Sequence, residues 1–65
     1  NTMRTVQEIV STPQSPTRAF LDKWVYSEPW QWQGNALAVE VKYLPLIREM
    51  MDADGLIEGL DYYVQ

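Results

Sequence analysis

The sequence predicts a small α+β domain in which two helices, a two-stranded hairpin and a third helix follow one another. Three observations predict this order. A turn with proline, STPQS at 11–15, separates two stretches that carry helix-start signals. Alternating apolar and polar residues over 30–43, interrupted by Gly34-Asn35, are typical of two strands joined by a tight turn. Leu-Pro at 44–45 then opens a stretch with helical apolar spacing.

The length and composition of the chain allow one domain, 1–65, with a small core. The chain has 65 residues, no cysteine and no histidine. A domain of this size buries only about 60% of its unfolded surface, so aliphatic and aromatic side chains must supply its stability. No apolar run approaches the roughly 18 residues of a membrane span, and no signal peptide pattern is visible. We therefore expect a cytoplasmic domain without membrane contact, and Asn1-Thr2 before Met3 is consistent with an excerpt of a longer chain.

Capping signals predict the first two helices. TVQE at 5–8 has the spacing of a capping box, in which threonine and glutamate side chains satisfy the first backbone amides of a helix. Apolar residues follow it, so we expect a helix over about 5–11. SP at 15–16 supplies an N-cap and a proline at the first helical position, and EP at 28–29 ends the second helix, 16–27. The apolar face of this second helix is formed by Phe20, Leu21 and Trp24.

The hairpin and the third helix account for the rest of the expected core. WQWQ at 30–33 places both tryptophans on one face of a strand, where they would pack above the second helix. A second strand alternates over 37–43, and LP at 44–45 starts the third helix. The expected core positions of that helix are Leu46, Ile47, Met50 and Met51, and the alternative is a methionine-rich face that binds a partner. The remaining tail, 56–65, would add a short strand at 62–64 or fold over the core.

Two helices joined by a short turn and followed by a two-stranded wing make the winged helix-turn-helix layout. A closer resemblance lies in QEIVSTPQSP at 7–16, in Trp30, and in AVEVKYLP at 38–45 with the helix after it. In these segments the chain resembles the winged-helix domains at the N-termini of transposases and repressors of Mu-like phages. The layout fits the phage excisionases equally well. The chain departs from the family at the wing tip, 33–36, which has no basic residue.

The resemblance implies a DNA-binding domain of a phage or mobile-element protein that acts in transcription regulation or DNA recombination. Helix 16–27 would enter the major groove of double-stranded DNA, and the wing at 30–41 would touch the adjacent backbone. Arginine can pair with guanine, and lysine or threonine can contact phosphate. The candidate contacts are Arg4, Thr17, Arg18, Lys23, Gln31, Gln33, Asn35 and Lys42. The alternative is an ordinary solvated surface, including an Arg18–Asp22 ion pair along the helix.

The charge distribution supports a second hypothesis. Residues 1–43 carry four basic and four acidic side chains, whereas residues 44–65 carry one basic and five acidic ones, so the net charge of −4 lies in the last third. A DNA-binding domain usually presents a basic surface. A protein–protein interaction module on the same scaffold is therefore the alternative, with the acidic last third as the surface for self-association or for a protein partner.

An enzyme, a metal site and a cofactor are not expected. The chain lacks histidine, cysteine and a glycine-rich phosphate loop, which leaves little on which to build a catalytic site. DADG at 52–55 is similar to the start of a calcium-binding loop, but the third ligand and the closing glutamate of that loop are missing.

Overall fold

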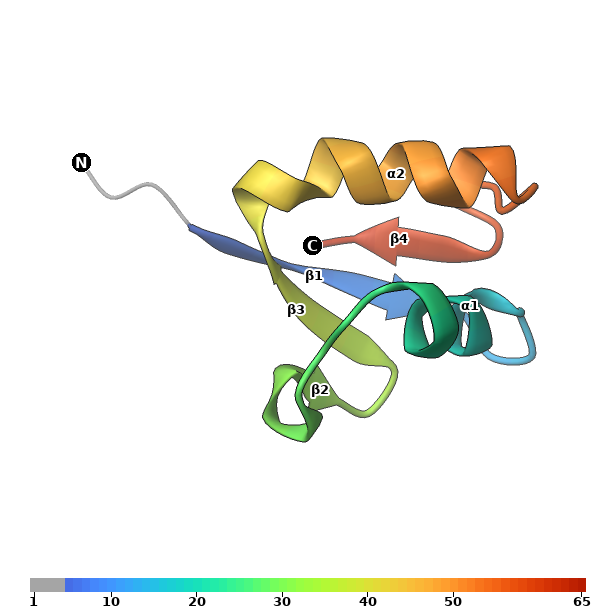
Figure 1. Cartoon of the computed structure of the whole chain (residues 1–65). Helices are drawn as coiled ribbons and strands as arrows, with labels where there is room; N and C mark the ends of the chain where they lie inside the picture. Colours follow the sequence, from blue (N-terminus) through green and yellow to red (C-terminus); the bar gives the residue numbers. More distant parts are fainter. Residues whose placement is uncertain (1–4) are drawn as a thin grey trace.

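The computed structural model describes residues 5–65, which form a four-stranded antiparallel sheet and two α-helices (Figure 1). The elements in chain order are β1 (Val6–Ser11), α1 (Thr17–Trp24), β2 (Trp32–Gln33), β3 (Ala36–Glu40), α2 (Leu44–Ala53) and β4 (Tyr62–Val64). The strands lie in the order β2-β3-β1-β4. A β-α-β-β-α-β chain of this kind has the element order of the split β-α-β, or ferredoxin-like, arrangement. The predicted α+β class is confirmed.

The helix predicted over 5–11 is wrong, because this segment is the central strand β1. The helix-turn-helix of the prediction therefore lacks its first helix in the described part of the chain. VQEIVS is rich in β-branched residues, which favour strands. The strand pairs with β3 along 6–10 and with β4 along 9–11. A capping box is a local signal worth about 1 kcal/mol, and pairing on both edges of the strand outweighs it.

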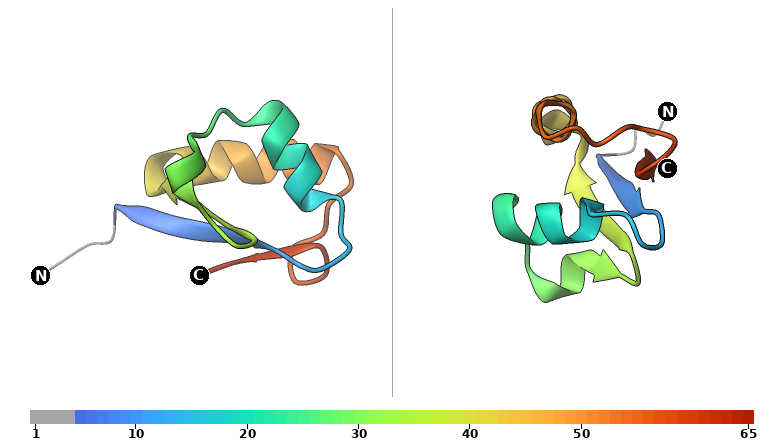
Figure 2. Two further views of the ribbon diagram at one scale, coloured as in Figure 1. Left: turned by 90° about the horizontal axis from the view of Figure 1, so that it is seen from below. Right: turned by 90° about the vertical axis from the view of Figure 1, so that its right-hand side faces the viewer.

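One face of the sheet carries the core, and both helices cover that face (Figure 2). Ile9 of β1 lies opposite Leu37 of β3 and opposite Val64 of β4, so the three side chains share the covered face. The buried apolar residues are Ile9, Leu21, Leu37, Val39, Leu44, Ile47, Met51, Leu56 and Tyr62. Burying a large aliphatic side chain contributes about 1.5–3 kcal/mol, so this aliphatic cluster accounts for most of the stability of a small domain.

The proline-containing turn connects β1 to α1 and is tied to the end of the chain. The backbone carbonyl of Asp61 accepts hydrogen bonds from the hydroxyls of Thr12, Ser15 and Thr17 at 2.8–3.0 Å. The Thr12 amide donates to the same carbonyl at 3.0 Å. The predicted turn exists, but it joins a strand to a helix and anchors both to the segment before β4.

The other predicted elements are confirmed with shorter bounds. Helix 16–27 is α1, which ends at Trp24, and the third helix is α2. β2 and β3 pair around Gly34-Asn35, and Gly34 has the positive φ of 61° that such a turn requires. The second strand ends at Glu40 rather than 43, because a 3-10 turn, η2 (Val41–Tyr43), carries the chain from the sheet into α2. The tail forms the edge strand β4.

The predicted tryptophan core is only partly correct. Trp32 packs against the core, and its indole Nε1 donates to the Ser27 hydroxyl at 3.1 Å. Trp30 lies in a 3-10 turn, η1 (Pro29–Gln31), and 81% of its surface is exposed. Trp24 is also exposed, at the end of α1. The proline at the start of η1 bends the chain there, so 30–33 is not one strand and its alternation does not place both rings on one face.

Candidate functional site

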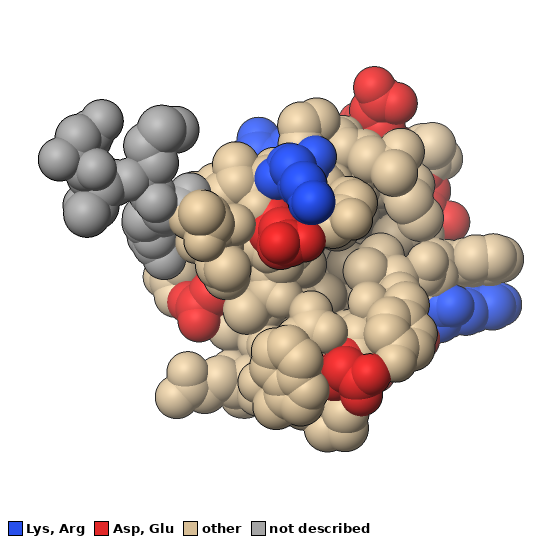
Figure 3. Space-filling model, turned by 60° about the vertical axis from the view of Figure 1, so that its left-hand side comes forward, with Lys and Arg blue, Asp and Glu red and all other residues tan. Residues whose placement is uncertain are grey.

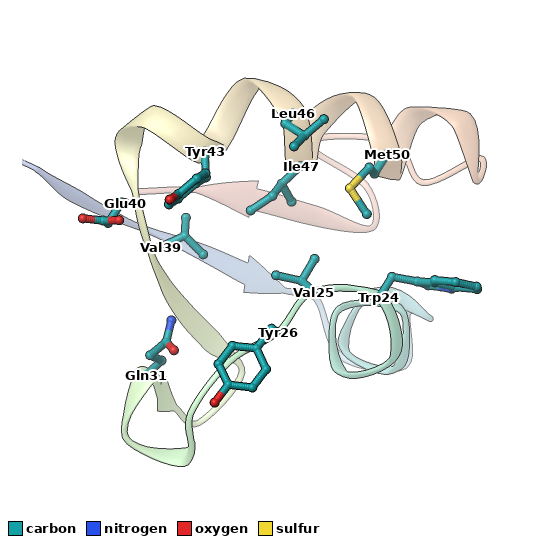
Figure 4. Close-up of a pocket in the computed structure, with 10 residues that line it drawn as sticks. All are labelled: Trp24, Val25, Tyr26, Gln31, Val39, Glu40, Tyr43, Leu46, Ile47 and Met50. Carbon is teal, nitrogen blue, oxygen red and sulfur yellow. The ribbon is translucent and has the colours of Figure 1, made fainter.

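An apolar hollow of about 340 Å³ lies between the end of α1 and the flank of α2 (Figure 4). Its floor is formed by Val25, Val39 and Ile47. Its walls come from two sides: Tyr43, Leu46 and Met50 stand on the α2 side, and Trp24, Tyr26 and Gln31 on the side of α1 and η1. Ligand sites in proteins commonly have volumes of about 300–1,000 Å³ and mostly apolar linings. We name this site the α1–α2 groove.

The walls of the α1–α2 groove expose large apolar side chains. Leu46 is 58% exposed and Tyr43 is 50% exposed, whereas Ile47 and Met51 of the same helix are buried. The helix therefore has an apolar face wider than the stripe that the core occupies. Continuous apolar surface of this kind is typical of sites that bind proteins or ligands.

The apolar surface continues beyond the central hollow in two directions. One adjoining hollow shares Trp24 and Met50 with the groove, and Phe20, Ala53 and Asp54 complete its lining. A second adjoining hollow shares Val25 and Tyr26, and its other lining residues are Asp22, Ser27, Pro29 and Trp32. The central hollow and the first adjoining hollow lie along α2, whereas the second lies beside the end of α1 and the start of η1. An elongated ligand therefore fits this surface better than a small compact one.

Hydrogen bonds position Gln31 and Tyr26, which form the lower wall of the groove in Figure 4. The Gln31 side chain accepts from the Glu28 amide at 2.8 Å and donates to the Ala38 carbonyl at 3.0 Å, which ties η1 to β3. The Tyr26 hydroxyl donates to the Glu28 carboxylate. This hydrogen bond, with a smaller contribution from desolvation, raises the pKa of Tyr26 above its ordinary value of 10.0. The phenol is therefore neutral at physiological pH and remains a donor to Glu28.

Arg18, a candidate DNA contact, makes three interactions within the domain. Its guanidinium carbon lies 3.8 Å from the centre of the Trp32 ring, and its Nη1 donates to the Gly34 carbonyl at 3.0 Å. Its Nε lies 3.5 Å from the Asp22 carboxylate, so the alternative of an Arg18–Asp22 pair is confirmed. Arg18 thus joins α1 to the β2–β3 turn.

The remaining candidate DNA contacts have varied surroundings. Thr17 is buried, and its hydroxyl donates to the Asp61 carbonyl. Gln31 donates to the Ala38 carbonyl of β3. Lys42 lies 3.9 Å from the Glu40 carboxylate, and the ammonium of Lys23 lies 5.1 Å from the Trp24 ring centre. Gln33 and Asn35 are exposed on the hairpin. Arg4 lies outside the described residues.

On the face drawn in Figure 3, charged side chains do not form a patch of one sign. Figure 3 shows a mostly uncharged surface on which acidic and basic side chains lie singly or beside one another. Elsewhere, Arg48 of α2 pairs with Glu58 at 3.1 Å. Arg18, Lys42 and Arg48 each have an acidic neighbour, and a phosphate backbone would have to displace it to bind them.

The sequence prediction assigned Leu46 and Met50 to the core and did not identify the groove. The missed signal is the pattern YLPLIREMM over 43–51, in which apolar residues occur in adjacent pairs on successive turns. One member of each pair is enough to form the apolar stripe that packs on the core. The second member lies beside that stripe and lines the groove. Val25 and Tyr26 had no such signal, because their position depends on how the chain leaves α1.

Comparison with protein-family profiles, with curated proteins and with solved structures finds no match to this chain. Within residues 5–65, no helix has the length and apolar character needed to cross a membrane. The same residues contain no group of three or more acidic, histidine or cysteine side chains placed to hold a metal ion.

Proposed function

We propose that this domain is a protein-interaction module whose α1–α2 groove binds an apolar segment of a partner protein. The observation that carries the proposal is the continuous hollow whose walls expose Trp24, Tyr26, Tyr43 and Leu46 above a floor of core residues. Burying apolar surface away from water is favourable by about 25 cal/mol per Å² of apolar area. Aromatic side chains are also enriched among the residues that dominate binding energy at protein interfaces.

The groove needs little ordering before it binds. Its floor belongs to the core and to α2, and its lower wall is fixed by the Gln31 hydrogen bonds to Glu28 and Ala38. Association loses free energy when loops and side chains must become ordered. A groove whose floor and Gln31 are already held in place avoids part of that loss, which favours specific binding at this surface.

An amphipathic helix is the form of partner that suits the groove. An extended peptide gains affinity from main-chain hydrogen bonds along an open sheet edge. The groove instead lies over the covered face of the sheet, and side chains of α2, α1 and η1 surround it. Apolar side chains of the partner must therefore supply the contacts, and a helix presents them at i, i+3, i+4 and i+7.

DNA binding by a winged helix, which the sequence resemblance implies, stays a prediction. Domains of that class normally cluster lysine and arginine on one face. The cations of the described chain are few, and three of them have acidic neighbours. These observations lead us to place the interaction module first.

The proposal is tested by nuclear magnetic resonance titration of the labelled domain with a synthetic amphipathic helical peptide of about 14 residues, or four turns. We expect shifts confined to the groove and about tenfold weaker binding by Leu46→Ser. Leu60→Ser is the matched control, because Leu60 is 66% exposed and does not line the groove. Shifts elsewhere, or equal binding by both variants, would overturn the proposal. A DNA duplex titrated in parallel at low salt tests the other prediction.

A further inference from the structure

The charged residues that line the groove and its two adjoining hollows have one sign. Among residues 5–65, the charged members of these linings are Asp22, Glu40 and Asp54, and all three are acidic. Glu28 adds a fourth carboxylate at the lower wall through its bond from Tyr26. Two cations also lie beside the walls, because the Lys42 ammonium is 5.2 Å from the Tyr43 ring centre and that of Lys23 is 5.1 Å from the Trp24 ring centre. The border therefore carries both signs, with carboxylates in excess.

Two of these carboxylates are not neutralised within the described part of the chain. No lysine or arginine of that part lies within 4.0 Å of Glu28 or Asp54. Glu40 has a weak partner, because Lys42 stands 3.9 Å away and more than half of each side chain is exposed. Asp22 is the best compensated, since it faces Arg18.

Glu40 lines the groove and Asp54 lines the adjoining hollow that shares Trp24 and Met50, so the two carboxylates mark opposite ends of this combined surface. Glu40 precedes η2 at the N-terminal end of α2, and its side chain points outward at the margin in Figure 4. Asp54 is the C-cap of α2. The ten residues of α2 rise about 15 Å and the three residues of η2 add about 6 Å, so the two carboxylates lie up to about 21 Å apart along the helix axis. The carbonyl end of the helix also carries partial negative charge, so it adds to the attraction for a cation near Asp54.

A second copy of this chain would bring the wrong charge to these margins. The chain has a net charge of −4, and the groove flank of α2 is itself bordered by carboxylates. Like charges placed together across an interface disfavour association, whereas complementary potentials accelerate it. The charge pattern thus selects a cationic partner over self-association.

We infer that the occupant of the α1–α2 groove is a basic amphipathic helix with lysine or arginine near both ends of its apolar face. This inference rests on the proposed function. The apolar face lies on Leu46, Tyr43 and the floor of the groove, and the two cations approach Glu40 and Asp54. A span of about 21 Å corresponds to about fourteen residues of the partner helix, or four turns.

Three peptides of about 14 residues test the inference. They share one leucine face and differ at the two flanking positions, which carry lysine, glutamine or glutamate. Fluorescence anisotropy of labelled peptides measures their affinities, which should decrease in the order lysine, glutamine, glutamate. At low salt the lysine peptide should bind about five- to tenfold more tightly than the glutamine peptide, as expected for two exposed ion pairs. The advantage should shrink as salt increases.

A matched pair of charge variants locates the effect. Asp54→Asn should reduce the advantage of the lysine peptide about two- to threefold without changing the affinity of the glutamine peptide. Asp52→Asn removes the same charge from α2 but should leave the ranking unchanged. Asp52 lies toward β4, where it adds to burial and Glu58 in raising the pKa of Tyr62.

The outcomes separate the two proposals. Failure of all three peptides to bind would overturn the interaction module itself. Equal affinities, or a preference for the glutamate peptide, would overturn the inference about charge while the module stands. Sedimentation of the free domain provides a further check, and a dimer that peptides dissociate would show that a second copy is the occupant and would overturn the inference.

Discussion

The two sides of α2 differ in what surrounds their side chains. On the inner side, Leu44, Ile47 and Met51 are buried in the core. On the groove side, Leu46 and Met50 are equally apolar, yet together with Tyr43 at the N-cap they border an open hollow. The comparison shows that apolar periodicity in a short helix can serve two surfaces at once. Adjacent positions on one turn separate the core from the open hollow that we propose as the binding site.

The largest expected effect is on stability, and it distinguishes alanine substitutions at the two neighbouring methionines, Met50 and Met51. Met51→Ala should destabilise the domain by about 2–5 kcal/mol, because the buried side chain leaves a cavity. Met50→Ala should cost less than about 1 kcal/mol, since Met50 is half-exposed in the groove. Urea denaturation followed by circular dichroism measures both. If Met51→Ala does not fold, Ile47→Val should still show a loss of about 0.5–1.5 kcal/mol. Equal losses of stability in Met51→Ala and Met50→Ala would contradict the assignment of Met51 to the core and of Met50 to the groove.

The next largest effect concerns binding, and it compares two tyrosines on opposite faces of the molecule. Tyr43→Ser should weaken the helical peptide about tenfold, as expected for an aromatic anchor at an interface. Tyr63 of β4 has similar exposure, but it alternates with buried Tyr62 and so lies on the uncovered face of the sheet. Tyr63→Ser should leave peptide affinity unchanged in the same anisotropy measurement. A similar loss in both variants would mean that binding is not confined to the groove.

A smaller effect distinguishes the two cations of α1. Arg18→Ala should cost about 1 kcal/mol, because it removes the stacking on Trp32 and the hydrogen bond to Gly34. Lys23→Ala should change stability by no more than about 0.5 kcal/mol, as at an ordinary exposed site. Thermal denaturation of the two variants measures the difference. A result in which Arg18→Ala is neutral would show that the arginine does not join α1 to the hairpin.

The smallest effect is the pH response of the groove wall. Because the pKa of Tyr26 is raised in the folded state, its contribution to stability is present below pH 10 and is lost as pH rises through the folded pKa. Glu28→Gln removes the carboxylate that is the main cause of this shift. The Tyr26 ring signals should then titrate at lower pH in the variant than in the parent domain, as followed by nuclear magnetic resonance. An unchanged titration would indicate that the hydroxyl does not bond to Glu28 in solution.

The contrast between β1 and α2 shows which predictions succeed from sequence. LPLIREMMDA combines a proline near its start with apolar residues at helical spacing, and each local signal agrees with the helix that forms. The helix-capping pattern TVQE overlaps the start of VQEIVS, which is also rich in β-branched residues, so the local signals of this segment conflict. Pairing with β3 and β4 decides that conflict, and a pattern of single residues cannot reveal partners 25 or more positions away. The same limit explains why the candidate DNA contacts did not identify the groove.

The sequence by itself determined the α+β class, the hairpin at Gly34-Asn35, two helices and the acidic last third, because each depends on neighbours a few residues apart or on composition alone. The tertiary structure decided that residues 6–11 form a central strand, that Trp24 and Trp30 remain exposed, and that Leu46 and Met50 face a groove. These outcomes depend on which side of an element meets another element. Apolar residues specify that burial must occur, and the packing of the whole chain selects which of them are buried.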